Sequence, residues 1–64
     1  AIEVEYDYNW KEAIGQSLHY AETTKKNPAI LFIKRKSSKK NYFQEMMSTI
    51  NAFNLPIHVE IIFE

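Results

Sequence analysis

Two carboxylates on one side of the first predicted strand are the side chains best suited to chemistry. Within residues 1–8, Glu3, Glu5 and Asp7 alternate with apolar and aromatic residues. This period of two predicts a β-strand, with Glu3 and Glu5 projecting from the same side. Two carboxylates at that spacing can bind Mg²⁺, which can activate water and neutralise charge on a phosphodiester. The same alternation also fits the solvated face of an edge strand, so both interpretations stay open.

A second pair of polar side chains lies on the helix predicted after this strand. Asn9 is a suitable N-cap, with Glu12 at the position of a capping-box partner, and helical spacing continues to about residue 24. Gln16 and Tyr20 are four residues apart and therefore lie on one face of this helix. Its apolar stripe consists of Trp10, Ala13, Ile14, Ser17, Leu18 and Ala21.

The only glycine of the chain, Gly15, falls within this helix. Glycine in a helix interior costs roughly 1 kcal/mol relative to alanine. An interior glycine usually has a packing reason despite this cost, so the sequence predicts close packing of the helix against the sheet at Gly15.

Three further segments continue the alternation of strands and helices. Residues 29–34 form a continuous apolar run, which is typical of a strand buried on both faces. Ser37 or Ser38 is expected to cap a second helix over about residues 40–53, and a final edge strand follows Pro56. The apolar stripe of the second helix consists of Phe43, Met46, Met47, Ile50 and Phe53. The apolar side of the final strand consists of Ile57, Val59, Ile61 and Phe63.

This order of elements predicts an α/β fold for residues 1–64, a single β-α-β-α-β unit with parallel strands and right-handed crossovers. Two successive crossovers in one direction place both helices on one face of the sheet. The other face is then uncovered, so we expect either sequence preceding Ala1 or a second copy of the molecule to cover it. Because the chain begins within a strand and without Met, we expect a partial domain.

The spacing of the two polar pairs resembles the later motifs of the RecB-like branch of the PD-(D/E)XK nuclease-like superfamily. There, a strand with an acidic-x-Lys motif is followed by a helix with Q-x-x-x-Y, as in Glu3-x-Glu5 and Gln16-x-x-x-Tyr20. The stretch WKEAIGQSLHYA, residues 10–21, adds to the likeness, which covers roughly residues 1–35. The resemblance implies the second half of a restriction-endonuclease-like fold. It also implies Mg²⁺-dependent hydrolysis of nucleic-acid phosphodiesters.

The resemblance assigns a role to each matching residue. Glu3 matches the acidic metal ligand of the strand, and Glu5 stands where the family usually has Lys. Gln16 and Tyr20 match the helical motif, which orients the catalytic site or contacts the substrate. The upstream Asp of the family has no counterpart in residues 1–64. The resemblance therefore implies an enzyme when the domain is complete, with magnesium as cofactor, and an inactive fragment otherwise.

A cluster of cations follows the predicted central strand. Clustered Lys and Arg suit contact with a phosphate backbone, DNA above all, and parallel sheets bind ligands at the carboxyl ends of their strands. A short basic run is also common in solvated loops, so this interpretation stays open as well. The cluster consists of Lys34, Arg35, Lys36, Lys39 and Lys40.

Composition excludes several other classes of protein. The chain has no cysteine, which excludes disulfides and cysteine-based zinc sites and fits a reducing, cytoplasmic location. The longest apolar run, residues 29–33, is too short to cross a membrane. A single glycine excludes a glycine-rich phosphate loop. His19 and His58 have no second ligand at metal-binding spacing, so structural roles are expected for both.

Three hypotheses follow. The first is a nuclease-like domain that hydrolyses nucleic acid when it is complete. The second is a non-catalytic nucleic-acid-binding relative that kept the fold, which the glutamate at position 5 favours. The third is a homo-oligomeric interaction module that associates through the uncovered face of its sheet.

Overall fold

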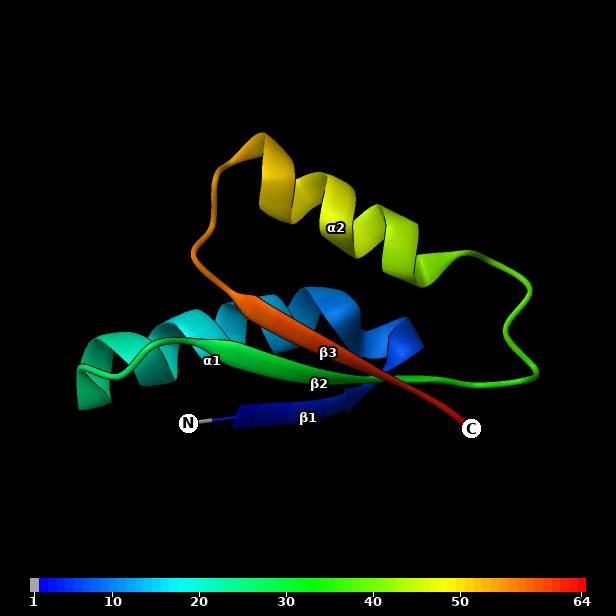
Figure 1. The fold of residues 1–64 in the computed structure, drawn as a ribbon, viewed down its shortest axis with the longest axis horizontal. Coiled ribbons are helices and arrows are strands. Elements are labelled where there is room, and N and C mark those ends of the chain that lie inside the picture. Colours follow the sequence, from blue (N-terminus) through cyan, green and yellow to red (C-terminus); the bar gives the residue numbers. More distant parts are fainter. Residues whose placement is uncertain (1) are drawn as a thin grey trace.

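The computed structural model describes residues 2–64 as a three-stranded sheet with two α-helices (Figure 1). All strands are parallel, in the order β1-β2-β3, so the predicted β-α-β-α-β unit is confirmed. In chain order the elements are β1 (Ile2–Tyr6), a 3-10 helix η1 (Asp7–Asn9), α1 (Trp10–Thr24), β2 (Ala29–Lys34), α2 (Tyr42–Ala52) and β3 (His58–Phe63).

The hydrophobic core lies between the sheet and the two helices, both of which cover the same face. The central strand β2 contributes Ile30 and Phe32, which are almost fully buried. The ring of Phe32 meets that of Phe43 edge to face, with centroids 5.4 Å apart. The remaining buried residues of the core are Trp10, Ala13, Ile14, Met46, Ile50 and Ile57. The predicted stripes of both helices are therefore confirmed, except that Phe53 at the end of α2 is exposed.

The ends of the elements differ from the prediction in three places. β1 ends at Tyr6 instead of residue 8, because Asp7 begins η1. The Asn9 side chain makes no capping hydrogen bond to α1, so the capping box is absent. α2 begins at Tyr42, and its cap is Asn41 instead of Ser37 or Ser38. The Asn41 side chain accepts a hydrogen bond from the Gln44 amide at 3.1 Å.

Gly15 does not mark a close approach between α1 and the sheet. It is exposed, and a Cβ added there would meet no atom within 4 Å. The packing explanation for this glycine is therefore wrong. Gly15 lies on the side of α1 opposite the buried residues Ala13, Ile14 and Ser17. This side of the helix faces solvent and not the sheet.

The side of the sheet away from the helices has no cover within residues 2–64. Glu3 is paired with Ile30 and Glu5 with Phe32, and paired residues of neighbouring strands point to the same side. The acidic side of β1 therefore faces the helices, and its apolar side faces solvent, with Ile2 69% exposed. We call this apolar surface the open sheet face. Its residues are Ile2, Val4, Tyr6, Ala29, Leu31, Ile33, His58, Glu60 and Ile62, of which only His58 and Glu60 are neither apolar nor tyrosine.

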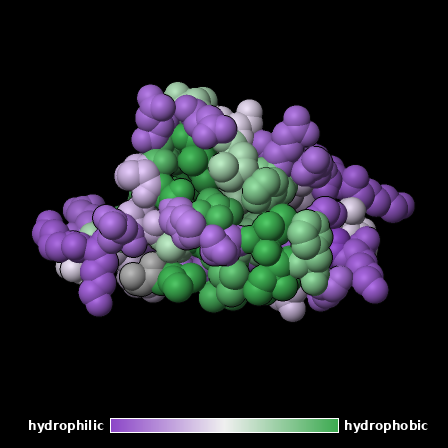
Figure 2. All heavy atoms as spheres, in the orientation of Figure 1, coloured by the Kyte–Doolittle hydropathy of each residue, from purple (hydrophilic) through white to green (hydrophobic). Residues whose placement is uncertain are grey.

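This arrangement confirms one prediction and corrects another. The uncovered face of the sheet is confirmed. However, β2 is buried on the helix side only, because Leu31 and Ile33 on the open sheet face are half-exposed. In Figure 2, apolar atoms gather over the strands, and the two ends of the molecule are hydrophilic.

Candidate functional site

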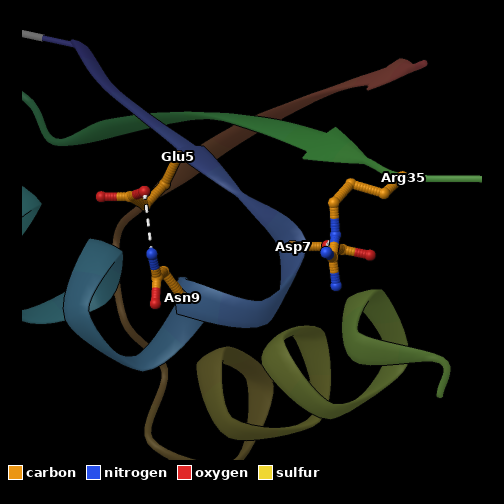
Figure 3. A network of polar contacts seen from close by, with 4 residues as sticks. All are labelled: Glu5, Asp7, Asn9 and Arg35. Atoms are coloured by element: carbon orange, nitrogen blue, oxygen red, sulfur yellow. Dashed lines mark hydrogen bonds and ion pairs between the residues drawn. The ribbon is translucent and has the colours of Figure 1, made fainter. Parts of the chain in front are cut away.

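An ion pair joins the carboxyl ends of β1 and β2. Asp7 follows β1 and Arg35 follows β2, and Tyr6 is paired with Ile33 at the ends of the same strands. The Arg35 Nε donates a hydrogen bond to the Asp7 Oδ1 over 3.1 Å (Figure 3). The Asp7 side chain is 1% exposed and that of Arg35 32% exposed. A carboxylate buried to this degree depends on its partner for the interactions it has lost with water.

The surroundings of Asp7 keep its carboxyl ionised. Burial by itself raises the pKa of Asp7, but the Ser38 hydroxyl and the Arg35 guanidinium and backbone amide outweigh burial. The pKa therefore lies below its ordinary value of 3.8. The Ser38 Oγ is buried and makes no hydrogen bond of good geometry within residues 2–64. Its effect on Asp7 is therefore that of a nearby dipole.

Two exposed tyrosine rings lie next to this ion pair. The Arg35 guanidinium carbon is 4.2 Å from the centroid of the Tyr8 ring, a cation–π contact. The Tyr8 ring is nearly parallel to the Tyr6 ring, at an angle of 10° with centroids 6.0 Å apart. Tyr6 is 41% exposed and Tyr8 47% exposed. The carboxyl edge of the sheet thus presents two aromatic rings and a guanidinium to solvent.

The predicted basic cluster occupies the end of β2 and the connection to α2, which we call the basic loop (residues 34–40). Arg35 pairs with Asp7, and the Lys40 Nζ lies 3.2 Å from the Glu45 Oε2. Lys34, Lys36 and Lys39 have no ion-pair partner within residues 2–64. Three cations therefore stay uncompensated by close carboxylates at the end of the molecule that also holds the N-terminus of α2 (Figure 1).

Glu3 and Glu5, the predicted catalytic pair, lie half-buried on the helix side of β1. The Asn9 Nδ2 donates a hydrogen bond to the Glu5 Oε1 over 3.4 Å (Figure 3). No group of three or more His, Cys, Asp or Glu side chains in the described part of the chain can hold a metal ion. Glu3, the predicted metal ligand, therefore lacks two further ligands of these types among the described residues.

Gln16 and Tyr20, the predicted helical pair, make only local contacts. The Gln16 Nε2 donates to the Glu12 Oε1 over 3.1 Å, and the exposed Tyr20 ring lies 6.1 Å from the His19 ring. α1 runs back along β1 at about 1.5 Å per residue, against about 3.3 Å in the strand, so Gln16 returns to roughly the level of the glutamates. Across residues 2–64, no hydrogen bond joins the helical pair to the strand pair.

The sequence places Asp7 on the acidic side of the first strand but does not indicate its partner, and it gives no role to Tyr6 or Tyr8. The signal that could have found them is positional. In a parallel sheet, the residues that directly follow neighbouring strands meet at one edge. In the structure Asp7 follows β1 and Arg35 follows β2, so this rule could have placed the two charges together.

Comparison with protein-family models, with curated proteins and with solved structures finds no match to this chain. The resemblance to PD-(D/E)XK nucleases therefore rests on the residues quoted above and stays a hypothesis. Within residues 2–64, neither helix is long and apolar enough to cross a membrane, and no pocket is present.

Proposed function

We propose that this chain binds the sugar-phosphate backbone of nucleic acid through the basic loop. The observation that carries the proposal is the set of three cations, Lys34, Lys36 and Lys39, that have no ion-pair partner within residues 2–64. They lie at the carboxyl ends of parallel strands, where α/β sheets tend to bind ligands. When a protein binds nucleic acid without sequence preference, contacts of Lys and Arg with phosphates supply most of its affinity.

The N-terminus of α2 supports the same proposal. α2 begins at Tyr42, directly after the basic loop, and its first backbone amides point toward that end of the molecule. The helix dipole adds positive potential there, which favours phosphate groups. The Asn41 side chain accepts a hydrogen bond from the Gln44 backbone amide, so this amide is not free for a phosphate and the helix dipole supplies the support.

Hydrolysis by a complete PD-(D/E)XK nuclease-like domain is the second function that we propose. Glu3 and Glu5 lie on the same side of β1, as a pair of carboxylates near a magnesium ion requires. The ion would polarise the phosphodiester and activate water, while the basic loop holds the backbone of the DNA. Because the described residues bring no three His, Cys, Asp or Glu side chains together, we expect this activity only when another part of the domain supplies further ligands.

Salt-dependent binding tests the first proposal. Fluorescence anisotropy of labelled DNA would be measured at increasing salt for the chain and for Lys36→Gln/Lys39→Gln. We expect the double variant to bind more weakly and to lower the slope of log K against log salt by about 1.4–1.8. Lys25→Gln/Lys26→Gln removes the same charge after α1, at the other end of the strands, and is the matched control. No DNA binding, or equal losses in the two double variants, would contradict the proposal.

Cleavage assays of the complete domain test the second proposal. We expect Mg²⁺-dependent cleavage of DNA that Glu3→Gln abolishes, because the amide removes the negative charge that a hard cation requires. DNA binding should survive in this variant. Absence of both divalent-dependent cleavage and metal binding in the complete domain would exclude the catalytic function and leave the backbone-binding proposal intact.

A further inference from the structure

We infer that Tyr6, Tyr8 and Arg35 form a stacking platform for unpaired bases, so that the nucleic acid bound by this chain is single-stranded. The inference rests on the proposed binding of the backbone by the basic loop, and it adds the form of nucleic acid that fits. Its starting point is the layer of two tyrosine rings and a guanidinium at the carboxyl edge of the sheet.

The two tyrosines expose aromatic surface to solvent, although the Arg35 guanidinium covers one face of the Tyr8 ring. The two rings are within 10° of parallel, and both residues are more than two-fifths exposed. Bases of single strands stack on such rings, and each stacked base contributes about 1–3 kcal/mol, with little dependence on sequence. Aromatic side chains on an open sheet face bind bases in this way in RNA-binding modules. In a duplex the bases are already stacked and paired, so they offer no free face to the rings.

Arg35 is held in an orientation that suits a phosphate next to a stacked base. Its Nε donates a hydrogen bond to Asp7, and its guanidinium carbon lies 4.2 Å from the centroid of the Tyr8 ring. Within residues 2–64, the terminal Nη groups make no side-chain hydrogen bond. A guanidinium whose position is fixed on one side can present its other edge to two phosphate oxygens with little further loss of entropy.

The charges around the stacking platform favour a polyanion over another protein. Tyr6 is paired with Ile33, and the chain continues from Ile33 directly into the basic loop. Lys34, Lys36 and Lys39 lie at the same carboxyl end of the sheet as the rings, with Lys34 on the helix side of β2 and the other two in the connection to α2. A second copy that met the rings through its own open sheet face would cover apolar surface but offer these three cations a single carboxylate, Glu60. A single strand satisfies both features, with bases on the rings and phosphates on the cations.

The test compares a labelled single-stranded oligonucleotide with a duplex of equal length, by fluorescence anisotropy at constant salt. We expect the chain to prefer the single strand. Tyr6→Leu/Tyr8→Leu should lower single-strand affinity by tenfold or more and leave duplex affinity unchanged. Tyr6→Phe/Tyr8→Phe keeps the rings and should bind like the parent chain. Tyr6→Leu alone, which leaves the Tyr8–Arg35 contact in place, serves if the double variant does not fold by circular dichroism.

Each other outcome overturns the inference in a recognisable way. If both oligonucleotides bind equally and the leucine variants change nothing, the stacking platform is excluded while backbone binding stands. If neither binds, the proposed function fails, and the inference fails with it. If the leucine variants keep their affinity but convert a dimer to a monomer in sedimentation, the rings belong to a contact between copies.

Discussion

Asp7 is the acidic side chain whose replacement should cost the most stability. It is buried, and Arg35 is its only ion-pair partner within residues 2–64. Asp7→Asn keeps the shape of the side chain but removes its charge, so Arg35 loses its counterion. We expect a loss of about 1–3 kcal/mol in the free energy of unfolding at neutral pH, measured by urea denaturation. Glu22→Gln, on an exposed turn of α1, is the control and should be neutral.

The contribution of Asp7 also has a defined dependence on pH. Because the folded pKa lies below the ordinary value of 3.8, the stabilisation is complete above that value and is lost as pH falls through the folded pKa. The parent chain should therefore lose stability in that acid range, and its unfolding midpoint should approach that of Asp7→Asn. If the unfolding midpoints of the parent chain and of Asp7→Asn differ by the same amount at every pH, the stabilisation does not come from ionised Asp7.

Individual side chains of β1 were only partly predictable from the sequence. Alternation is a local pattern, so the division of β1 into an acidic and an apolar side is correct. The side that faces the helices depends on the strand pairing, which is not local. Asp7 and Arg35 are 28 residues apart, so no short-range pattern indicates their ion pair. The roles of Glu3, Glu5, Gln16 and Tyr20 stay predictions, because they rest on a resemblance and not on contacts.

Helix α1 should become more stable when its glycine is replaced. Gly15 has a negative φ, and a Cβ there meets no atom within 4 Å, so alanine fits without strain. Alanine also loses less backbone entropy on folding. We expect Gly15→Ala to raise the free energy of unfolding by about 0.5–1 kcal/mol, measured by urea denaturation. Glu22→Ala is the control, because glutamate and alanine have similar helix propensities and the substitution should change stability little. A loss of stability in Gly15→Ala would contradict the prediction.

The helices and strands themselves were largely predictable, because the sequence patterns that indicate them span only a few neighbouring residues. The end of α1 and the bounds of β2 follow from a proline and an apolar run that lie close together in the sequence. The beginning of α2 was misplaced, although Asn41 with Gln44 three residues later is itself a capping signal. Gly15 was also misread, because its position off the apolar stripe of α1 already placed it on the exposed side.

Without nucleic acid, the part of the open sheet face beyond the stacking platform should make the isolated chain self-associate. Chains of this length bury only about 60% of their unfolded surface, and here Val4 and Ile62 are among the apolar side chains left exposed. We expect the sedimentation coefficient to rise with concentration, and Val4→Thr/Ile62→Thr to suppress the rise while keeping strand propensity. Ser48→Thr, on exposed α2 surface, is a control. A monomer at every concentration would contradict this expectation.

The topology could be predicted because the order of elements and the handedness of crossovers leave few alternatives. The same rule predicted that both helices lie on one face and that the other is uncovered. The occupant of that face could not be predicted. Strand patterns describe which side chains are apolar, but they do not say whether a nucleic acid, another segment or a second copy contacts them.

The parallel pairing of the strands has a consequence for the order of events in folding. Each ladder of the sheet joins strands separated by a whole helix, as in the pairing of Ile2 with Ala29 and of Ala29 with His58. Within residues 2–64 no two strands form a hairpin that could nucleate the sheet. Its hydrogen bonds therefore form only after the chain between two strands has closed into a loop. The helices need only local contacts and can form first. The rate at which this chain folds should therefore respond more to substitutions that strengthen α1 and α2 than to those in the edge strands.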